Sequence, residues 1–445
     1  MVFSRIYKKI DDNPKWELLF HNAIFFAGTA LISAFNYLYY PVLSRIVDVP
    51  SFGEIQALIS LFMQFGVVLT AFGYMVTNIV ANSNDTQTSG RYINWLEKRV
   101  LLFCIAIFAI LTLASSYFGS EFKITSVWPV ILIGILLIIN VPATSRSFIL
   151  QAQKRLGTLS IAGVVFAIGK LFLGVTFIWL FTDDVFAAIT GYVIAQIVML
   201  AYVRNKTRDV YKYSVFKSVV QTSRKLSDDH ITKGHIHYGL AILIILSGLA
   251  LLYTSDTIIA RLFFDSHTLG IYSGISSIAR IIYFVTASVA AVLLASVTIR
   301  AGRVVNNTAL KQSLLIVGLV GGGVALVFTL FPEIFVKTLI GSQYLDGSEW
   351  LPILSLVMLV CSINNLLAIY QIALRRKKTI IPVTAGIVSL TIGLTCYHSS
   401  IDQFIGVFLA SNLLVCVLLS MEIVLENKRG KDSAKETAVD RIAEL

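Results

Sequence analysis

The feature that most constrains this chain is its succession of apolar runs, each roughly 20 residues long. A helix of that length crosses the hydrocarbon core of a bilayer, which is about 30 Å thick. Inside that core only helices and closed barrels satisfy their own backbone, and continuous apolar runs of this length indicate helices. The composition agrees, because 56% of the 445 residues are hydrophobic and only 14% are charged. The sequence therefore predicts an all-α polytopic membrane protein.

Hydropathy predicts about twelve membrane spans. They are Leu18–Ser44, Ile55–Ala81, Val100–Phe118, Val127–Leu150, Thr158–Phe181, Val185–Val203, Tyr238–Ile258, Ile271–Ile299, Gln312–Leu330, Trp350–Ile372, Thr379–Tyr397 and Phe404–Leu425.

Basic residues alternate along the connections between these spans. The connections on one side are rich in Lys and Arg, whereas those on the other hold at most one each: Arg45, Lys123, Arg261 and Lys337. By the positive-inside rule, both termini and the basic connections are cytoplasmic. The same rule explains the net charge of +11 as membrane topology and attraction to anionic lipids, so we expect no nucleic-acid partner.

Two turns between spans resemble each other across the chain. In the first and second copies the paired residues are Arg45 and Arg261, Asp48 and Asp265, Ser51 and Thr268, and Gly53 and Gly270. Each copy follows one apolar run and precedes another. Together with a second echo between 151–155 and 371–376, this favours a duplicated chain in which both halves have the same orientation.

The duplication predicts two parallel-repeat six-helix bundles around a central cavity. We expect an N-terminal bundle over residues 1–205 and a C-terminal bundle over 238–427. Between them, residues 206–237 form a cytoplasmic linker whose apolar residues recur at helical spacing among basic ones, which is typical of an interfacial amphipathic helix. Residues 428–445 are expected to be a cytoplasmic tail.

Two cations lie deep inside predicted spans, where a charge costs about 2.5–3.5 kcal/mol. Lys170 is about twelve residues into the fifth span and Arg280 about ten into the eighth, so both fall near the midplane at 1.5 Å per residue. Small and polar neighbours on their helical faces suit a cavity or a packed helix. Each could be the structural partner of a carboxylate or a helix terminus. The alternative is binding of an anionic substrate such as a phosphate or pyrophosphate.

Two further charges have open roles. Asp256, near the outer end of the seventh span, could pair with Arg261 or Arg280, or exchange a proton in an ion-coupled cycle. Arg146, near the inner end of the fourth span, could extend to the cytoplasm or guide a lipid phosphate inward. Five asparagines in spans are expected to form interhelical hydrogen bonds, with sugar contact as the alternative: Asn36, Asn78, Asn140, Asn364 and Asn365.

Nothing in the sequence predicts catalysis or a cofactor. We find no nucleotide-binding loop and no Ser/His/Asp constellation, and the outer loops are short. His230, His235 and His237 cluster beside two aspartates, but their spacing matches no established metal pattern. We therefore expect neither a metal site nor a cofactor, and no enzymatic activity.

Several motifs resemble the polysaccharide flippases of the multidrug/oligosaccharidyl-lipid/polysaccharide superfamily. They are Tyr40–Arg45 with Ser51–Glu54, Asp256 with Gly270–Ser273, and Phe331–Glu333 with Gly341–Tyr344. The resemblance implies two six-helix bundles that move lipid-linked sugars across the bacterial inner membrane. In a related flippase an arginine early in the eighth span is implicated in binding the substrate diphosphate, and the resemblance carries that role to Arg280 alone.

The leading hypothesis is a flippase for an undecaprenyl-diphosphate-linked oligosaccharide, with Arg280, Lys170 and Arg146 as substrate-binding residues. Its expected partners are the lipid-linked oligosaccharide, membrane lipids and the polysaccharide polymerase machinery. A drug or cation antiporter of the same superfamily is the alternative, which requires an acidic cavity residue such as Asp256. A membrane-embedded glycan polymerase is a third hypothesis, against which the short outer loops count.

Overall fold

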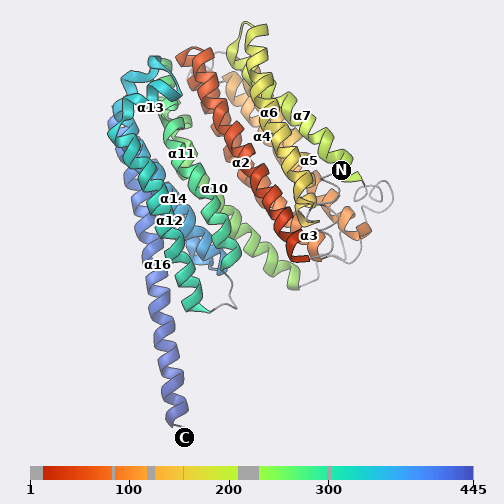
Figure 1. The fold of residues 1–445 in the computed structure, drawn as a ribbon, viewed down its shortest axis with the longest axis vertical. Coiled ribbons are helices and arrows are strands. Elements are labelled where there is room, and N and C mark those ends of the chain that lie inside the picture. The colour runs from red at the N-terminus through yellow and green to blue at the C-terminus, as the bar shows by residue number, and fades with distance from the viewer. Residues whose placement is uncertain are drawn as a thin grey trace. The chain divides into compact units, whose positions relative to one another are not determined.

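The structure is a computed structural model that describes residues 14–82, 86–117, 126–153, 155–208, 230–297 and 302–443. Within these ranges the regular elements are all helical, which confirms the predicted fold class (Figure 1). The helices are α2 (Pro14–Ile46), α3 (Val49–Asn82), α4 (Thr86–Tyr117), α5 (Val127–Ala152), α6 (Leu156–Leu180), α7 (Asp184–Lys206), α10 (His230–Phe263), α11 (Ser266–Ser296), α12 (Arg303–Leu330), α13 (Pro332–Leu339), η2 (Ser342–Trp350), α14 (Leu351–Ala373), η3 (Lys377–Thr379), α15 (Ile380–Cys396) and α16 (Ile401–Ala443).

Every predicted span corresponds to one of these helices. Among the described residues, 10 helices are long and apolar enough to cross a membrane. The other two predicted spans coincide with α2 and α4, which have 33 and 32 residues. Several helices extend beyond the apolar core that hydropathy detects. The helix α16 continues to Ala443, past the predicted end of its span at Leu425.

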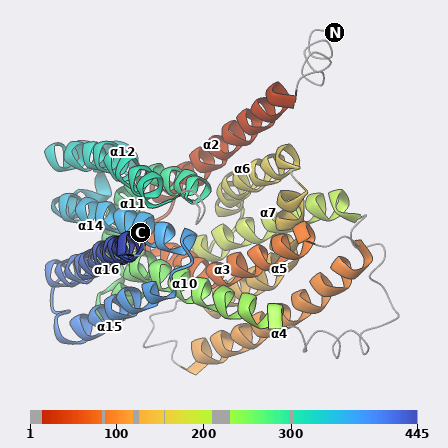
Figure 2. The ribbon, with the colours of Figure 1, turned by 90° about the horizontal axis from the view of Figure 1, so that it is seen from below.

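The chain forms two compact units. Unit 1 contains residues 1–235 together with the short segments 264–274 and 339–343. In this unit α6 packs against α2 and α7, and α5 packs against α3, α4 and α7 (Figure 2). The predicted amphipathic linker helix falls largely on residues 209–229, which lie outside the described residues.

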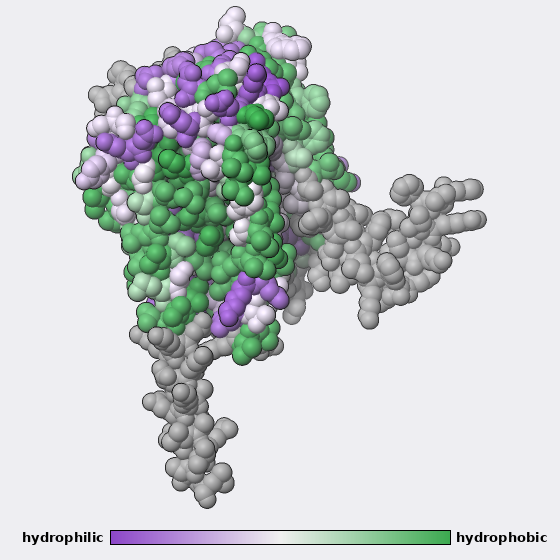
Figure 3. Space-filling view, turned by 60° about the vertical axis from the view of Figure 1, so that its left-hand side comes forward, coloured by the Kyte–Doolittle hydropathy of each residue, from purple (hydrophilic) through white to green (hydrophobic). Residues whose placement is uncertain are grey.

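Unit 2 contains residues 236–263, 275–338 and 344–445. Here α14 packs against α12 and α16, and α15 packs against α16. Large apolar side chains on α12 are exposed, including Leu315, Leu319 and Leu326. A broad hydrophobic belt covers the face seen in Figure 3, with most hydrophilic residues gathered above it and a smaller hydrophilic group below it. An exposed apolar surface of this kind suits contact with lipid.

Candidate functional site

Lys170 is the buried cation of unit 1. It lies on α6 and is 4% exposed. Its Nζ donates a 2.8 Å hydrogen bond to Oδ1 of Asn36 on α2. The same Nζ lies 4.4 Å from the ring centroid of Tyr39 and 5.2 Å from that of Tyr192 on α7, with the Tyr40 ring at 5.8 Å. Each ring is within cation–π range, so neutral oxygen and aromatic faces surround the ammonium group.

Small residues let the neighbouring helices close around Lys170. A Cβ on Gly191 of α7 would lie 2.5 Å from the backbone nitrogen of Gly174 on α6. A Cβ on Gly163, on the same face of α6, would lie 2.3 Å from Cδ1 of Ile32 on α2. The face of α6 that carries small residues beside Lys170 was expected to line a cavity or to pack against a helix. In the structure it packs against α2 and α7. This close packing accounts for the low exposure of the lysine.

Lys170 has no acidic partner in the part of the chain that the structure describes. Ion pairs of other described cations include Arg146 with Glu97, Arg280 with Asp256 and Lys378 with Glu426. A buried charge without an opposite charge is held only by hydrogen bonds and aromatic faces, which offset part of its desolvation cost. Lys170 is therefore a buried lysine whose contacts, among the described residues, include no carboxylate.

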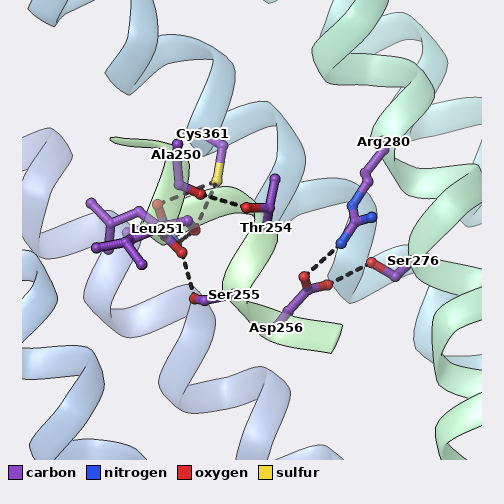
Figure 4. Close-up of polar contacts among 10 residues, drawn as sticks. Ala250, Leu251, Thr254, Ser255, Asp256, Ser276, Arg280 and Cys361 are labelled. Atoms are coloured by element: carbon purple, nitrogen blue, oxygen red, sulfur yellow. Dashed lines mark hydrogen bonds and ion pairs between the residues drawn. The ribbon is translucent and has the colours of Figure 1, made fainter. Parts of the chain in front are cut away.

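Arg280 of α11 is also buried, but its charge is neutralised within unit 2. Its Nη2 lies 2.6 Å from Oδ1 of Asp256 on α10, and the two residues are 5% and 0% exposed. Ser276 donates a 2.6 Å hydrogen bond to the other carboxylate oxygen, Oδ2. Asp256 and Arg280 point toward each other from adjacent helices (Figure 4). Of the two pairings that the sequence left open for Asp256, the structure shows this one.

Arg146 lies on α5 and contacts an acid that the sequence analysis did not identify. Its Nη1 lies 3.3 Å from Oε1 of Glu97 on α4 and donates a 2.9 Å hydrogen bond to the carbonyl oxygen of Pro142. The arginine and glutamate side chains are 12% and 14% exposed. The Arg146 guanidinium therefore contacts α4. Neither of the two roles expected for Arg146, extension to the cytoplasm or guiding of a lipid phosphate, includes this contact.

The predicted site residues therefore divide between the two units. Lys170 and Arg146 belong to unit 1, and Asp256 and Arg280 belong to unit 2. The structure brings Asp256 and Arg280 into direct contact, and it pairs Arg146 and Lys170 with other residues of unit 1. In this arrangement Arg280 and Arg146 each contact an acid, whereas the Lys170 amine contacts the Asn36 oxygen and aromatic rings.

The expected interhelical hydrogen bonds are confirmed for three asparagines. Asn36 accepts from Lys170, Asn140 accepts a 2.9 Å bond from Gln196, and Asn364 donates a 2.9 Å bond to the Asn412 carbonyl. The side chain of Asn78 lies outside the described residues.

Sequence reasoning missed the tyrosines around Lys170. Two helices far apart in the sequence carry them: α2 has Tyr39 and Tyr40, and α7 has Tyr192. In the sequence, each is indistinguishable from any other aromatic residue of a membrane span. The available signal was the adjacent tyrosine pair at 39 and 40, one helical turn after Asn36.

Among the described residues no group of three or more His, Cys, Asp or Glu side chains is arranged to hold a metal ion. The histidine cluster that the sequence analysis considered, His230, His235 and His237, has side chains outside the described residues.

A family model described as polysaccharide biosynthesis protein matches residues 19–295, which is more than half of the chain. This match confirms the resemblance found in the sequence. No curated protein sequence matches the chain.

Solved structures with a similar fold include membrane transporters and a lipid flippase. A multidrug resistance MATE family transporter of the MOP superfamily, in an inward-facing conformation, has a TM-score of 0.68 at 13% identity and covers 89% of this chain and 96% of its own. The lipid II flippase MurJ, in an inward closed conformation, has a TM-score of 0.66 at 13% identity, covering 91% and 87%. The MATE multidrug transporter DinF-BH has a TM-score of 0.63 at 15% identity, covering 92% and 95%. At these identities the similarity is one of fold.

Proposed function

Because the chain belongs to the polysaccharide biosynthesis protein family, we propose that it is a flippase for an undecaprenyl-diphosphate-linked oligosaccharide. It moves this substrate across the bacterial inner membrane by alternating access, for the synthesis of a surface polysaccharide such as an O-antigen. Both termini are cytoplasmic in this proposal. The substrate passes to the polysaccharide polymerase machinery, and the protein itself catalyses no covalent step.

The observation that carries the proposal is the burial of Lys170 without a carboxylate beside it in the described residues. In the described part of the chain, its ammonium group contacts the Asn36 oxygen and tyrosine rings, and no carboxylate. A diphosphate supplies the negative charge that this environment lacks, and lysine binds phosphate as a point charge. The tyrosines suit a second role, because aromatic rings with hydroxyl groups can pack against sugars and donate hydrogen bonds.

Arg280 and Arg146 differ from Lys170 in how they could bind phosphate. Each already contacts a carboxylate, Asp256 or Glu97. To bind a diphosphate, either guanidinium must exchange that carboxylate for a phosphate group. We propose that Lys170 makes the primary contact and that the two arginines bind phosphate only in states where their ion pairs open.

Export of polysaccharide by cells tests the proposal. In a bacterial host whose own copy of this protein is deleted, Lys170→Ala is expected to abolish surface polysaccharide at normal protein level. The matched control is Lys311→Ala, because Lys311 is an exposed lysine of α12 and its loss should leave export unchanged. Full export by well-expressed Lys170→Ala would contradict the proposal.

The second candidate function is a drug or cation antiporter, which the fold shared with MATE multidrug transporters supports. A cationic substrate requires an acid that is able to bind it. Asp256 is fully buried, and both of its carboxylate oxygens are engaged by Arg280 and Ser276. Export of cationic dyes by the purified protein in vesicles, lost on Asp256→Asn substitution, would favour this function over the flippase.

A further inference from the structure

Four consecutive cations lie in the connection between α14 and α15, at one end of these two helices of unit 2. They are Arg375, Arg376, Lys377 and Lys378. Arg376 is half-buried, and the other three are exposed. By the positive-inside rule, this connection is expected to face the cytoplasm. Exposed cations beside a membrane span suit the phosphate groups of lipids.

Arg375 adopts a backbone conformation that favours glycine. Its φ is 56°, and no other non-glycine residue in the described ranges has a positive φ. Helices commonly end with a glycine in this conformation, because a Cβ makes it unfavourable. Non-glycine residues persist there only where the surrounding structure holds them, and they cluster at binding sites and switches. An arginine at this position therefore favours a binding role for its side chain.

Hydrogen bonds hold the connection to α14 and to α16. The Arg376 amide donates to the Gln371 carbonyl on α14 at 3.0 Å. The Gln371 side chain, which is fully buried, accepts a 2.8 Å bond from the Thr379 hydroxyl and donates a 3.2 Å bond to the Leu419 carbonyl on α16. The four cations therefore have a fixed place beside α16.

The helix α16 presents two acids to these cations. Glu422 and Glu426 are four residues apart and share a helical face. Glu426 Oε1 lies 3.8 Å from Nζ of Lys378, and the two side chains are 33% and 64% exposed. Large apolar side chains of the same turns are exposed as well: Met421, Val424 and Leu425. Because the predicted span also ends at Leu425, the acids lie where hydrocarbon gives way to lipid headgroups.

Two of the charged groups have atoms without hydrogen-bond partners. Both carboxylate oxygens of Glu422 and Nη1 of Arg376 are buried, and none of these three atoms has a partner within the described residues. The two side chains act on each other electrostatically, but no hydrogen bond joins these atoms. Buried polar atoms without partners are costly. A molecule that both donates and accepts hydrogen bonds would therefore be stabilised here.

The chemistry of the cluster identifies the kind of molecule that fits it. A phosphate group accepts hydrogen bonds from the exposed cations, such as Arg375 and Lys377. A primary ammonium group donates to the carboxylates of Glu422 and Glu426 and neutralises their charge. Acyl chains suit the exposed apolar surface of α16. A phospholipid with an ethanolamine headgroup has all three parts.

We propose that residues 375–378 together with Glu422 and Glu426 form a binding site for phosphatidylethanolamine, named here the aminophospholipid site. The lipid phosphate binds the cations of the connection, and its ammonium group binds the two acids of α16. Arg376 and Lys378 have long side chains that can shift to admit the ammonium group to Glu422. The proposal is independent of what the protein transports.

The lipid selectivity of the native protein tests the proposal. Native mass spectrometry of the purified protein compares three phospholipids that have identical acyl chains and an ethanolamine, choline or glycerol headgroup. The ethanolamine lipid should bind about tenfold more tightly than the choline lipid, because three methyl groups replace its N–H donors. It should also bind more tightly than the glycerol lipid, which has no cation for the acids. Equal binding of the ethanolamine and choline lipids, or a preference for the glycerol lipid, would overturn the proposal.

Variants that remove charge test the role of each part of the site. Glu422→Gln combined with Glu426→Gln should bring the affinities for the ethanolamine and choline lipids within about twofold of each other. Arg375→Gln combined with Lys377→Gln should weaken all three lipids, because each has a phosphate. The matched control is Lys311→Gln, since Lys311 is an exposed lysine of the same unit and its loss should change none of the affinities.

An undiminished ethanolamine preference in the folded double glutamine variant of α16 would contradict the proposal. If that variant does not fold, Glu426→Gln alone provides the milder test, because this side chain is 33% exposed, and it should still reduce the preference. Water-soluble phosphoethanolamine distinguishes a lipid site from a site for the headgroup alone. It should not displace the ethanolamine lipid at equal concentration, and displacement would refute a lipid site.

Discussion

Replacing Asp256 by alanine isolates the energetics of the buried ion pair. In the native protein its two carboxylate oxygens accept 2.6 Å hydrogen bonds from Arg280 and Ser276. The substitution leaves Arg280, which is 5% exposed, as a buried cation without its acid. Removing one partner of a buried pair costs about 3–5 kcal/mol. At about 2–4 °C per kcal/mol for a domain of 150–250 residues, Tm should fall by roughly 6–20 °C.

The matched control removes both charges together. Asp256→Leu combined with Arg280→Met replaces the pair with apolar side chains, and such replacements are commonly neutral or stabilising. The double variant should therefore melt near the native protein, well above Asp256→Ala. Ser276→Ala should fall between them, because it loses one hydrogen bond to a charged group, worth about 1.5–3 kcal/mol.

Thermal unfolding of the purified proteins in one detergent, followed by tryptophan fluorescence, provides the comparison. The reasoning is refuted if Asp256→Ala melts together with the native protein, or if the double variant is no more stable than the single one. Export by the stable double variant then separates the roles of Arg280. Retained export would show that the arginine serves stability, and lost export would show that it also acts on the substrate.

Two further predictions concern packing and helix capping. Gly191→Ala should destabilise unit 1 by about 1–3 kcal/mol in the same unfolding assay, because its Cβ would meet Gly174 at 2.5 Å. The control Gly66→Ala, whose Cβ meets nothing within 4 Å, should be neutral or slightly stabilising. Equal effects of the two substitutions would contradict the packing role of Gly191. Hydrogen bonds from the Thr268 side chain and backbone lower the pKa of Asp265, so its contribution to stability is complete above the unfolded pKa of about 3.9 and is lost as pH falls through the folded pKa. Asp265→Asn should flatten the fall of Tm in this acid range, and an unchanged pH profile would count against the capping role.

The positions of the spans could be predicted because a bilayer requires a minimum apolar length, which is visible in the sequence. Helix ends were less predictable, since polar residues continue a helix without any hydropathy signal. The third span was expected to start at Val100, but α4 begins at Thr86. That extension carries Glu97, and this is why the partner of Arg146 was missed.

The candidate site was predicted in part. Lys170 and Arg280 were recognisable as buried charges because cations are rare in apolar runs. The pairing of Arg280 with Asp256 was one of two possibilities, and choosing between them required the relative rotation of α10 and α11. The positions of the tyrosines around Lys170 depend on how α2, α6 and α7 pack together. Glycine contacts determine this packing, and hydropathy does not predict it.

The measurement that tests the central claim most directly is binding of a short-chain polyprenyl diphosphate to the purified protein in lipid nanodiscs. The claim is that Lys170, buried without a carboxylate beside it, binds the diphosphate through its ammonium group. Lys170→Met should therefore weaken binding at least about tenfold, a loss of about 1.4 kcal/mol or more, while Lys311→Met leaves the affinity unchanged. Native affinity in a folded Lys170→Met protein would contradict the claim.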